Sequence, residues 1–102
     1  MTRRYILAPE AARDLVQIWR YLKKENGERT ADRVESVIRS KIVFLAEHPR
    51  IGHWRRDLTS AEVRFFLVYS YLIVYRTETT PLQVVSILHC RRDVAAVLER
   101  RS

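Results

Sequence analysis

Two apolar runs rich in β-branched and aromatic residues lie in the second half of this chain. Residues 63–75 read Val-Arg-Phe-Phe-Leu-Val-Tyr-Ser-Tyr-Leu-Ile-Val-Tyr, and a second apolar run covers residues 84–88. β-branched and aromatic residues dominate both runs, which predicts strands. The first run is too long for one strand, and a two-residue turn at Tyr69-Ser70 divides it into a hairpin. The predicted pairs are Arg64 with Tyr75, Phe66 with Ile73, and Val68 with Tyr71.

Both faces of this predicted hairpin are apolar. A hairpin with one side in water should alternate between apolar and polar residues, so something must cover both sides here. The first face carries Arg64, Phe66, Val68, Tyr71, Ile73 and Tyr75, and the second carries Val63, Phe65, Leu67, Leu72, Val74 and Arg76.

Two amphipathic helices are predicted before the hairpin. Pro9 suits the first position of one helix, and Asn26-Gly27 ends it. Thr30 is a reasonable N-cap for the other, which Pro49 stops. The short connection implies an antiparallel pair. The apolar stripes are Ala12, Leu15, Val16, Ile18, Trp19 and Leu22, then Ala31, Val34, Val37, Ile38, Ile42 and Leu45; the polar face of the first helix is Glu10, Arg13, Asp14, Gln17 and Lys24.

The order of elements predicts an α+β fold with one domain over residues 1–102. A short first strand from Arg3 to Ala8 lies beside one of the later strands, and residues 91–101 form a short C-terminal helix. The arrangement β-α-α-β-β-β places an N-terminal helical hairpin on one face of a small, largely antiparallel sheet. Because that hairpin covers one face only, we expect a partner protein to cover the other. The alternative is that loop 50–61 and the terminal helix fold over it.

Composition limits the classes of partner. The net charge of +7 favours an acidic protein or a nucleic acid, although a solvated basic surface explains the charge equally well. A single cysteine, Cys90, excludes an intramolecular disulfide and favours the cytoplasm. No apolar stretch approaches the length of a membrane span.

An ordered set of short segments over nearly the whole chain resembles the RelE/ParE superfamily of bacterial toxins, in its ParE-like branch. The resemblance implies the toxin, or plasmid stabilisation protein, of a type II toxin–antitoxin pair. An acidic ParD-like antitoxin would neutralise it by wrapping the helical hairpin and part of the sheet. The segments are Leu7-Ala8-Pro9-Glu10-Ala11, Ile18-Trp19, Leu22, residues 46–52 (Ala-Glu-His-Pro-Arg-Ile-Gly), Val63-Arg64, residues 71–76 (Tyr-Leu-Ile-Val-Tyr-Arg), Ile87-Leu88-His89 and Arg91-Arg92-Asp93.

The superfamily contains ribosome-dependent messenger-RNA endonucleases and toxins that poison DNA gyrase. RNA cleavage through the 2′-hydroxyl needs a base, an acid and cations around the phosphate. Arg64 matches the strand arginine of the nucleases, and His89 lies near the end of the last strand, but Cys90 follows where a tyrosine would stand. The balance favours a gyrase-binding toxin with no active site of its own. A RelE-type nuclease using Arg64 and His89, and a non-toxic binding-only relative, are the alternatives.

The candidate contact residues for the target or the antitoxin are mostly arginines. Trp54 either stacks on a base or covers the core, and Arg64 either contacts phosphate or pairs with a carboxylate such as Asp93. The histidines lack the spacing of a metal site, and no cofactor motif is present, so neither a metal nor a cofactor is expected. The candidates are Arg50, Trp54, Arg55, Arg56, Arg64, Arg91, Arg92, Arg100 and Arg101.

Overall fold

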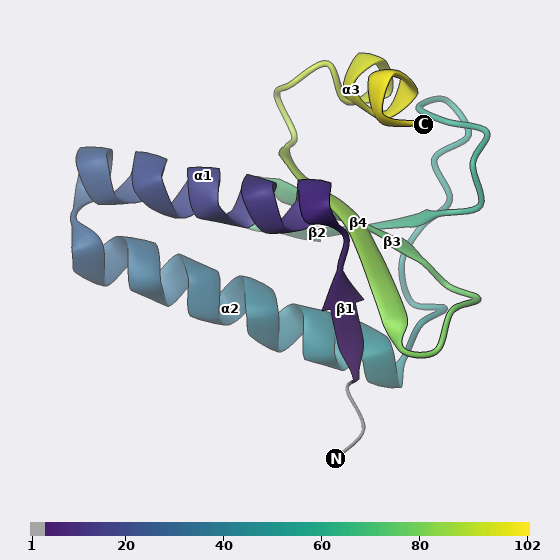
Figure 1. Cartoon of the computed structure of the whole chain (residues 1–102), viewed down its shortest axis with the longest axis horizontal. Helices are drawn as coiled ribbons and strands as arrows, with labels where there is room; N and C mark the ends of the chain where they lie inside the picture. Colours follow the sequence, from purple (N-terminus) through teal and green to yellow (C-terminus); the bar gives the residue numbers. More distant parts are fainter. Residues whose placement is uncertain (1–3) are drawn as a thin grey trace.

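A computed structural model describes residues 4–102 of the chain, with two long helices, a four-stranded sheet and a short terminal helix (Figure 1). None of the described helices is both long enough and apolar enough to cross a bilayer. The elements are β1 (Tyr5–Leu7), α1 (Pro9–Asn26), α2 (Glu28–Glu47), β2 (Arg64–Val68), β3 (Tyr71–Arg76), β4 (Leu82–His89) and α3 (Val94–Arg101).

The sheet confirms the predicted α+β class and the position of the first strand. Its strand order is β1-β4-β3-β2, with β1 parallel to β4 and the other neighbours antiparallel. The sequence predicts the first strand from Arg3 to Ala8, whereas β1 covers only Tyr5–Leu7. Arg3 itself lies outside the described residues. The hairpin of β2 and β3 has the predicted register, and Tyr69 takes a positive φ of 54° in its two-residue turn.

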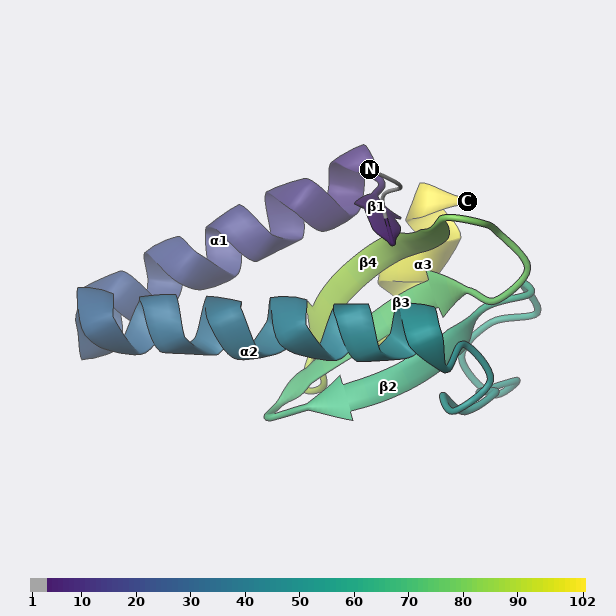
Figure 2. The same ribbon diagram turned by 90° about the horizontal axis from the view of Figure 1, so that it is seen from below.

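The helical hairpin covers one face of the sheet (Figure 2). Residues of α2 at helical spacing, Ile38, Ile42 and Leu45, are fully buried there against Ile73 and Tyr75. The predicted N-cap at Thr30 is wrong, because α2 already begins at Glu28. Gly27, at a φ of 92°, connects the two helices. It occupies the N-cap position of α2, so no side chain makes a capping hydrogen bond there.

The second face of the sheet is covered by the chain itself, so the expectation that it lies bare and needs a partner is wrong. Leu58 from the loop before β2 and Val94, Val97 and Leu98 from α3 pack over it. Figure 2 shows α3 on the side of the sheet away from α2. This cover is the alternative that the sequence left open, and periodicity did not favour it because loop 50–61 has no regular pattern and α3 is only eight residues long. The sheet residues that the loop and α3 bury include Phe65, Leu72, Val74 and Leu88.

Asp14 faces the sheet, which corrects its predicted place on the polar side of α1. It lies between Ala11 and Leu15, which are both buried, whereas Val16 of the predicted apolar stripe is exposed. β1 pairs with β4 only as far as Val84, so the backbone of β4 beyond it lacks a neighbour on this side. The carboxylate of Asp14 accepts the N–H of Ile87 at 2.9 Å and thereby satisfies part of that open edge.

Arg101 holds α3 against this carboxylate. Its guanidinium donates two hydrogen bonds to Asp14, at 2.8 and 2.9 Å, and one to the Ser86 hydroxyl at 3.0 Å. The side chain of Asp14 is only 3% exposed and that of Arg101 is 26% exposed. The bidentate bond to Asp14 raises the pKa of Arg101. A charge pair with this geometry links α1, β4 and α3.

Substitution Arg101→Ala tests this link. It leaves Asp14 buried with a single backbone donor, so we expect the free energy of unfolding to fall by about 2–3 kcal/mol. The neighbouring Arg100 is exposed and serves as the matched control, with Arg100→Ala changing stability by less than about 0.5 kcal/mol. Urea denaturation measures both, and equal midpoints for the two variants would show that the ion pair adds nothing to stability.

Candidate functional site

The basic loop between α2 and β2 is anchored to the sheet through Tyr75. The fully buried hydroxyl of this tyrosine accepts the N–H of Gly52 at 2.9 Å and donates to the carbonyl oxygen of Pro49 at 2.8 Å. Burial raises the pKa of Tyr75, so the phenol stays protonated and keeps its donor. Gly52 packs so tightly that a Cβ would lie 2.9 Å from the ring of Tyr75 and 3.0 Å from the carbonyl oxygen of Phe65.

Arg64 continues this anchor and does not make the predicted pair with Asp93. Its guanidinium donates to the carbonyl oxygen of Gly52 at 2.9 Å and lies 4.3 Å from the ring centroid of Trp54. Its Nε is buried and has no hydrogen-bond partner among residues 4–102. Asp93 instead caps α3, accepting the N–H of Ala96 at 3.2 Å. Arg64 therefore orders the loop.

Two guanidinium groups lie against the ring of Trp54. Arg64 covers one face of the ring, and Arg56 lies 4.7 Å from the centroid. The indole does not belong to the buried core, and it remains partly exposed beside these two guanidinium groups. Cation–π contacts of this kind contribute roughly 0.5–1 kcal/mol each at exposed sites and hold the loop in one conformation.

The loop arginines differ in how far they are already paired. Arg55 makes a two-pronged ion pair with Asp57 at 2.8 and 3.0 Å, which lowers the pKa of that carboxyl. Arg56 bonds Glu62 at 3.2 Å and the carbonyl oxygen of Ser60 at 3.0 Å. Arg50 is exposed and forms no ion pair within residues 4–102.

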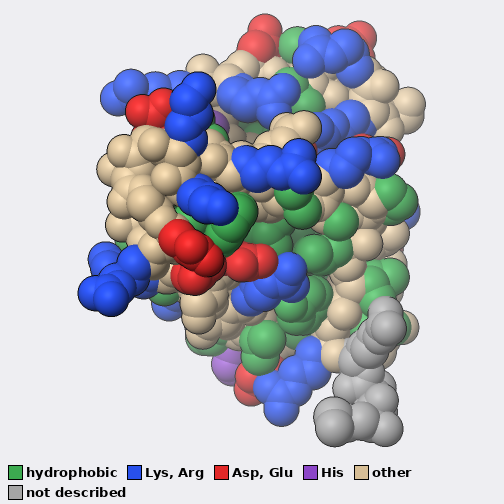
Figure 3. Space-filling model, turned by 60° about the vertical axis from the view of Figure 1, so that its left-hand side comes forward, with side chains coloured by type: hydrophobic (Ala, Val, Ile, Leu, Met, Phe, Trp, Pro, Cys, Tyr) green, Lys and Arg blue, Asp and Glu red, His purple; other side chains and the backbone are tan. Residues whose placement is uncertain are grey.

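The arginines at the end of the chain fall into two groups. Arg91, Arg92 and Arg100 are exposed and have no carboxylate within ion-pair distance in the described part of the chain. Arg101 is held by Asp14 and is not available to a partner in this structure. Figure 3 shows Lys and Arg side chains spread over one face of the molecule, with hydrophobic and a few acidic side chains between them.

Arg64 and His89 are far apart, so they cannot form one catalytic centre. Arg64 on β2 pairs with Tyr75 on β3, and Tyr75 pairs with Val84 on β4. His89 lies five positions further along β4 than Val84. At about 3.3 Å per residue this is roughly 17 Å along the strands. His89 accepts the N–H of Arg91 on its Nδ1 at 3.1 Å and packs edge-on against Tyr71.

His89 lines a hollow of about 300 Å³ beside α1, together with Tyr21, Tyr71 and Arg92. Burial raises the pKa of Tyr71. Sequence reasoning missed Tyr21, which is 61% exposed, and its signal was an aromatic residue outside the apolar stripe of α1. Val16, 48% exposed, adds a second apolar side chain to this helix. We call Tyr21 and the hollow beside His89 the α1 surface.

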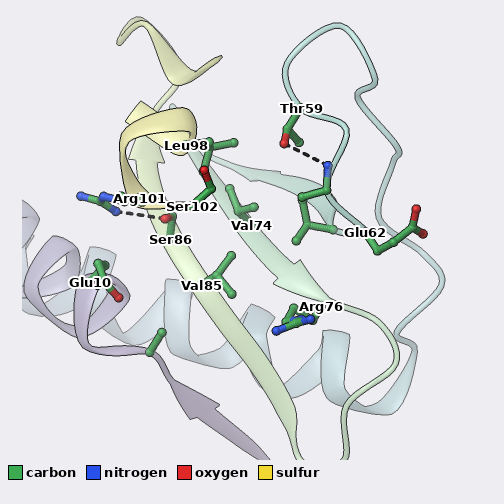
Figure 4. Close-up of a pocket in the computed structure, with 13 residues that line it drawn as sticks. Glu10, Thr59, Glu62, Val74, Arg76, Val85, Ser86, Leu98, Arg101 and Ser102 are labelled. Atoms are coloured by element: carbon green, nitrogen blue, oxygen red, sulfur yellow. Dashed lines mark hydrogen bonds between the residues drawn. The ribbon is translucent and has the colours of Figure 1, made fainter. Parts of the chain in front are cut away.

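A second hollow, of about 330 Å³, lies under the end of α3 (Figure 4). Val74, Val85 and Leu98 give it apolar walls, and Arg76 and Glu62 lie at its margin. No group of three or more His, Cys, Asp or Glu side chains within residues 4–102 could hold a metal ion. The described residues thus offer hollows and exposed arginines, and they do not bring Arg64 and His89 together.

Comparisons with known proteins agree with this architecture. A family model described as the ParE toxin of the type II toxin–antitoxin system parDE matches residues 5–94. A solved structure titled "Chromosomal ParDE TA system from P. aeruginosa" superposes with a TM-score of 0.72 at 18% identity, covering 83% of this chain and 92% of that chain. At that identity the likeness is one of fold. A comparison with curated protein sequences finds no match.

Substitution Gly52→Ala tests the anchoring of the loop. The added methyl group meets the Tyr75 ring and a backbone oxygen, so we expect a loss of about 2 kcal/mol in the free energy of unfolding. Chemical denaturation measures the loss. In the double variant with Tyr75→Phe the hydroxyl is gone, and the combined loss should be smaller than the sum of the single losses.

Gly27→Ala is the matched control for this pair. Nothing lies within 4 Å of its Cβ position, so its cost of about 1 kcal/mol comes from the positive φ alone. That cost should add to the cost of Tyr75→Phe. Simple additivity for Gly52→Ala and Tyr75→Phe would contradict the proposed close contact.

Proposed function

Because the chain belongs to the family of ParE toxins of type II toxin–antitoxin systems, we propose that it poisons DNA gyrase by docking on it, and that a ParD-like antitoxin neutralises it. The toxin would hold gyrase at the stage at which DNA is cut. In this proposal the toxin supplies binding surfaces and the gyrase supplies the chemistry. Both partners place the protein in the cytoplasm, and the pair would serve plasmid stabilisation.

The separation of Arg64 from His89 is the observation that carries the choice of binding over catalysis. General acid–base cleavage of RNA needs its groups within hydrogen-bond reach of one phosphate. A separation of roughly 17 Å along the strands does not allow this for Arg64 and His89. Arg64 is also committed to the carbonyl oxygen of Gly52 and the ring of Trp54. A structural arginine and a distant histidine support docking.

The α1 surface is the proposed site for the antitoxin. Val16 and Tyr21 are large apolar side chains left exposed on a helix that otherwise packs on α2 and β4. A helix or extended segment that lies along α1 would cover Tyr21 and enter the hollow that Tyr21 and His89 line. The net charge of +7 favours an acidic partner there.

The proposed contacts with gyrase use the exposed arginines of the loop before β2 and of the segment from Arg91 to Arg100. Arg50, Arg55 and Arg56 with Trp54 form a rigid basic loop, because Tyr75 and Arg64 hold it in place. Arg91, Arg92 and Arg100 lie before and on α3. Arg101 is left out of this surface, because its substitution would act through stability.

Expression of the protein without its antitoxin tests the proposal. We expect growth arrest with filamentation and induction of the DNA-damage response, and purified protein should increase gyrase-dependent DNA cleavage. A charge-neutral variant of Arg91, Arg92 and Arg100 should weaken these effects at least about tenfold, since it removes exposed contacts without disturbing the core.

Two other results would contradict the proposal. Rapid arrest of translation with cut messenger RNA would indicate a nuclease of the RelE type. Absence of any phenotype from a folded, well-expressed protein would indicate a relative that only binds its antitoxin. Where expression gives filamentation and DNA damage, as the proposal expects, co-expression with an acidic reading frame beside the gene should restore growth.

A further inference from the structure

The outer edge of β2 is open for part of its length. β2 is the last strand of the sheet, and its outer side is occupied at Phe65, which exchanges two backbone hydrogen bonds of 2.8 Å with His53. Outward-facing backbone groups recur at every second residue of an antiparallel strand, so the next set belongs to Leu67. Within residues 4–102 the N–H and C=O of Leu67 have no partner beyond the sheet.

Large apolar side chains cluster along the same edge. Leu67 and Tyr69 are both 57% exposed, and Ile51 and Trp54 in the adjoining loop are exposed as well. These four residues account for most of the large apolar side chains that the described chain leaves in solvent. An open strand edge with apolar flanks is a surface on which another chain can add a strand.

A third hollow, also of about 330 Å³ and separate from the one under the end of α3, lies next to Leu67 on the α3 side of the sheet. Leu58, Leu72 and Val94 contribute apolar walls, and Arg55 and Arg92 stand at its margin. Arg92 has no ion pair in the described chain, and the nearby carboxylates are occupied: Asp57 pairs with Arg55, and Asp93 caps α3. The hollow can therefore take an aliphatic side chain whose neighbours are acidic.

We propose that this edge receives an extended, acidic segment of the target protein, which adds to the sheet beside Leu67 and inserts one aliphatic side chain into the hollow. This inference rests on the proposed function and adds a place and a mode of docking to it. The segment exchanges backbone hydrogen bonds with Leu67 in line with His53, and its carboxylates meet Arg92 and Arg55.

Charge and position favour this occupant over the others. Two copies of the chain paired through this edge would bring Arg55 and Arg92 of each close to the same residues of the other, and like charges repel. The α1 surface, assigned above to the antitoxin, belongs to a helix that packs on β4, two strands away from β2. An antitoxin on α1 therefore leaves the β2 edge uncovered unless a further segment extends to it.

Substitutions of Leu67 test the proposal through the sign of a charge. Leu67→Glu places a carboxylate against the acidic segment, whereas Leu67→Lys removes the same apolar contact but attracts the segment. The wild-type side chain is exposed, so both variants should fold with unchanged thermal midpoints. Tyr21→Glu is the matched control on the α1 surface, where the wild-type side chain is equally exposed.

The measurement is equilibrium binding of each purified variant to purified DNA gyrase and to the antitoxin. We expect Leu67→Glu to bind gyrase at least about tenfold more weakly than wild type and Leu67→Lys to be affected less, with antitoxin affinity within about twofold of wild type for both. Tyr21→Glu should show the reverse pattern, with weakened antitoxin binding and unchanged gyrase binding.

Each other outcome overturns the inference in a distinguishable way. If wild type binds gyrase and Leu67→Glu binds it equally well, the β2 edge is not the docking site although the proposed function holds. If Leu67→Glu loses the antitoxin and keeps gyrase, the edge belongs to the antitoxin. If wild type does not bind gyrase, the proposed target is wrong and the inference falls with it.

Discussion

A sheet that is apolar on both faces must be covered on both sides, and this requirement shapes most of the chain. The helical hairpin covers one face with Ile38, Ile42 and Leu45, and the loop before β2 together with α3 covers the other. The large apolar side chains that the described chain still exposes lie mainly on α1 and at the outer edge of β2, where a backbone edge is also open.

Two buried polar groups hold in place the cover that is formed by α3 and the loop before β2. Asp14 accepts hydrogen bonds from Ile87 and Arg101, so it joins α3 to the rest of the fold. Tyr75 bonds Gly52 and Pro49, so it holds the basic loop against the sheet. Each group is satisfied by several partners, which is the condition for burying polar atoms without a large penalty. The exposed arginines thus project from a framework that is fixed from beneath, which lowers the entropic cost of docking.

Most of the fold, but little of the site, could be predicted from the sequence. The two-residue turn at Tyr69-Ser70 predicts the register of the β2–β3 hairpin, because the length of the turn decides which residues face each other. Asp14 was misplaced because a polar residue was assigned to the polar face, although its spacing from Ala11 and Leu15 matched the buried one. The contacts of Arg64 with Gly52 and Trp54 depend on an irregular loop, whose path no periodicity encodes.

The central claim is that this toxin acts by binding and holds no catalytic group of its own, and His89 allows the most direct test. In His89→Asn the amide oxygen can still accept the N–H of Arg91 two residues on, as the histidine does, but the side chain cannot transfer protons near neutral pH. The measurement is the toxicity of this variant when it is expressed without antitoxin, at matched protein level and thermal midpoint. We expect toxicity equal to that of wild type, whereas its loss in a variant of unchanged stability would contradict the account.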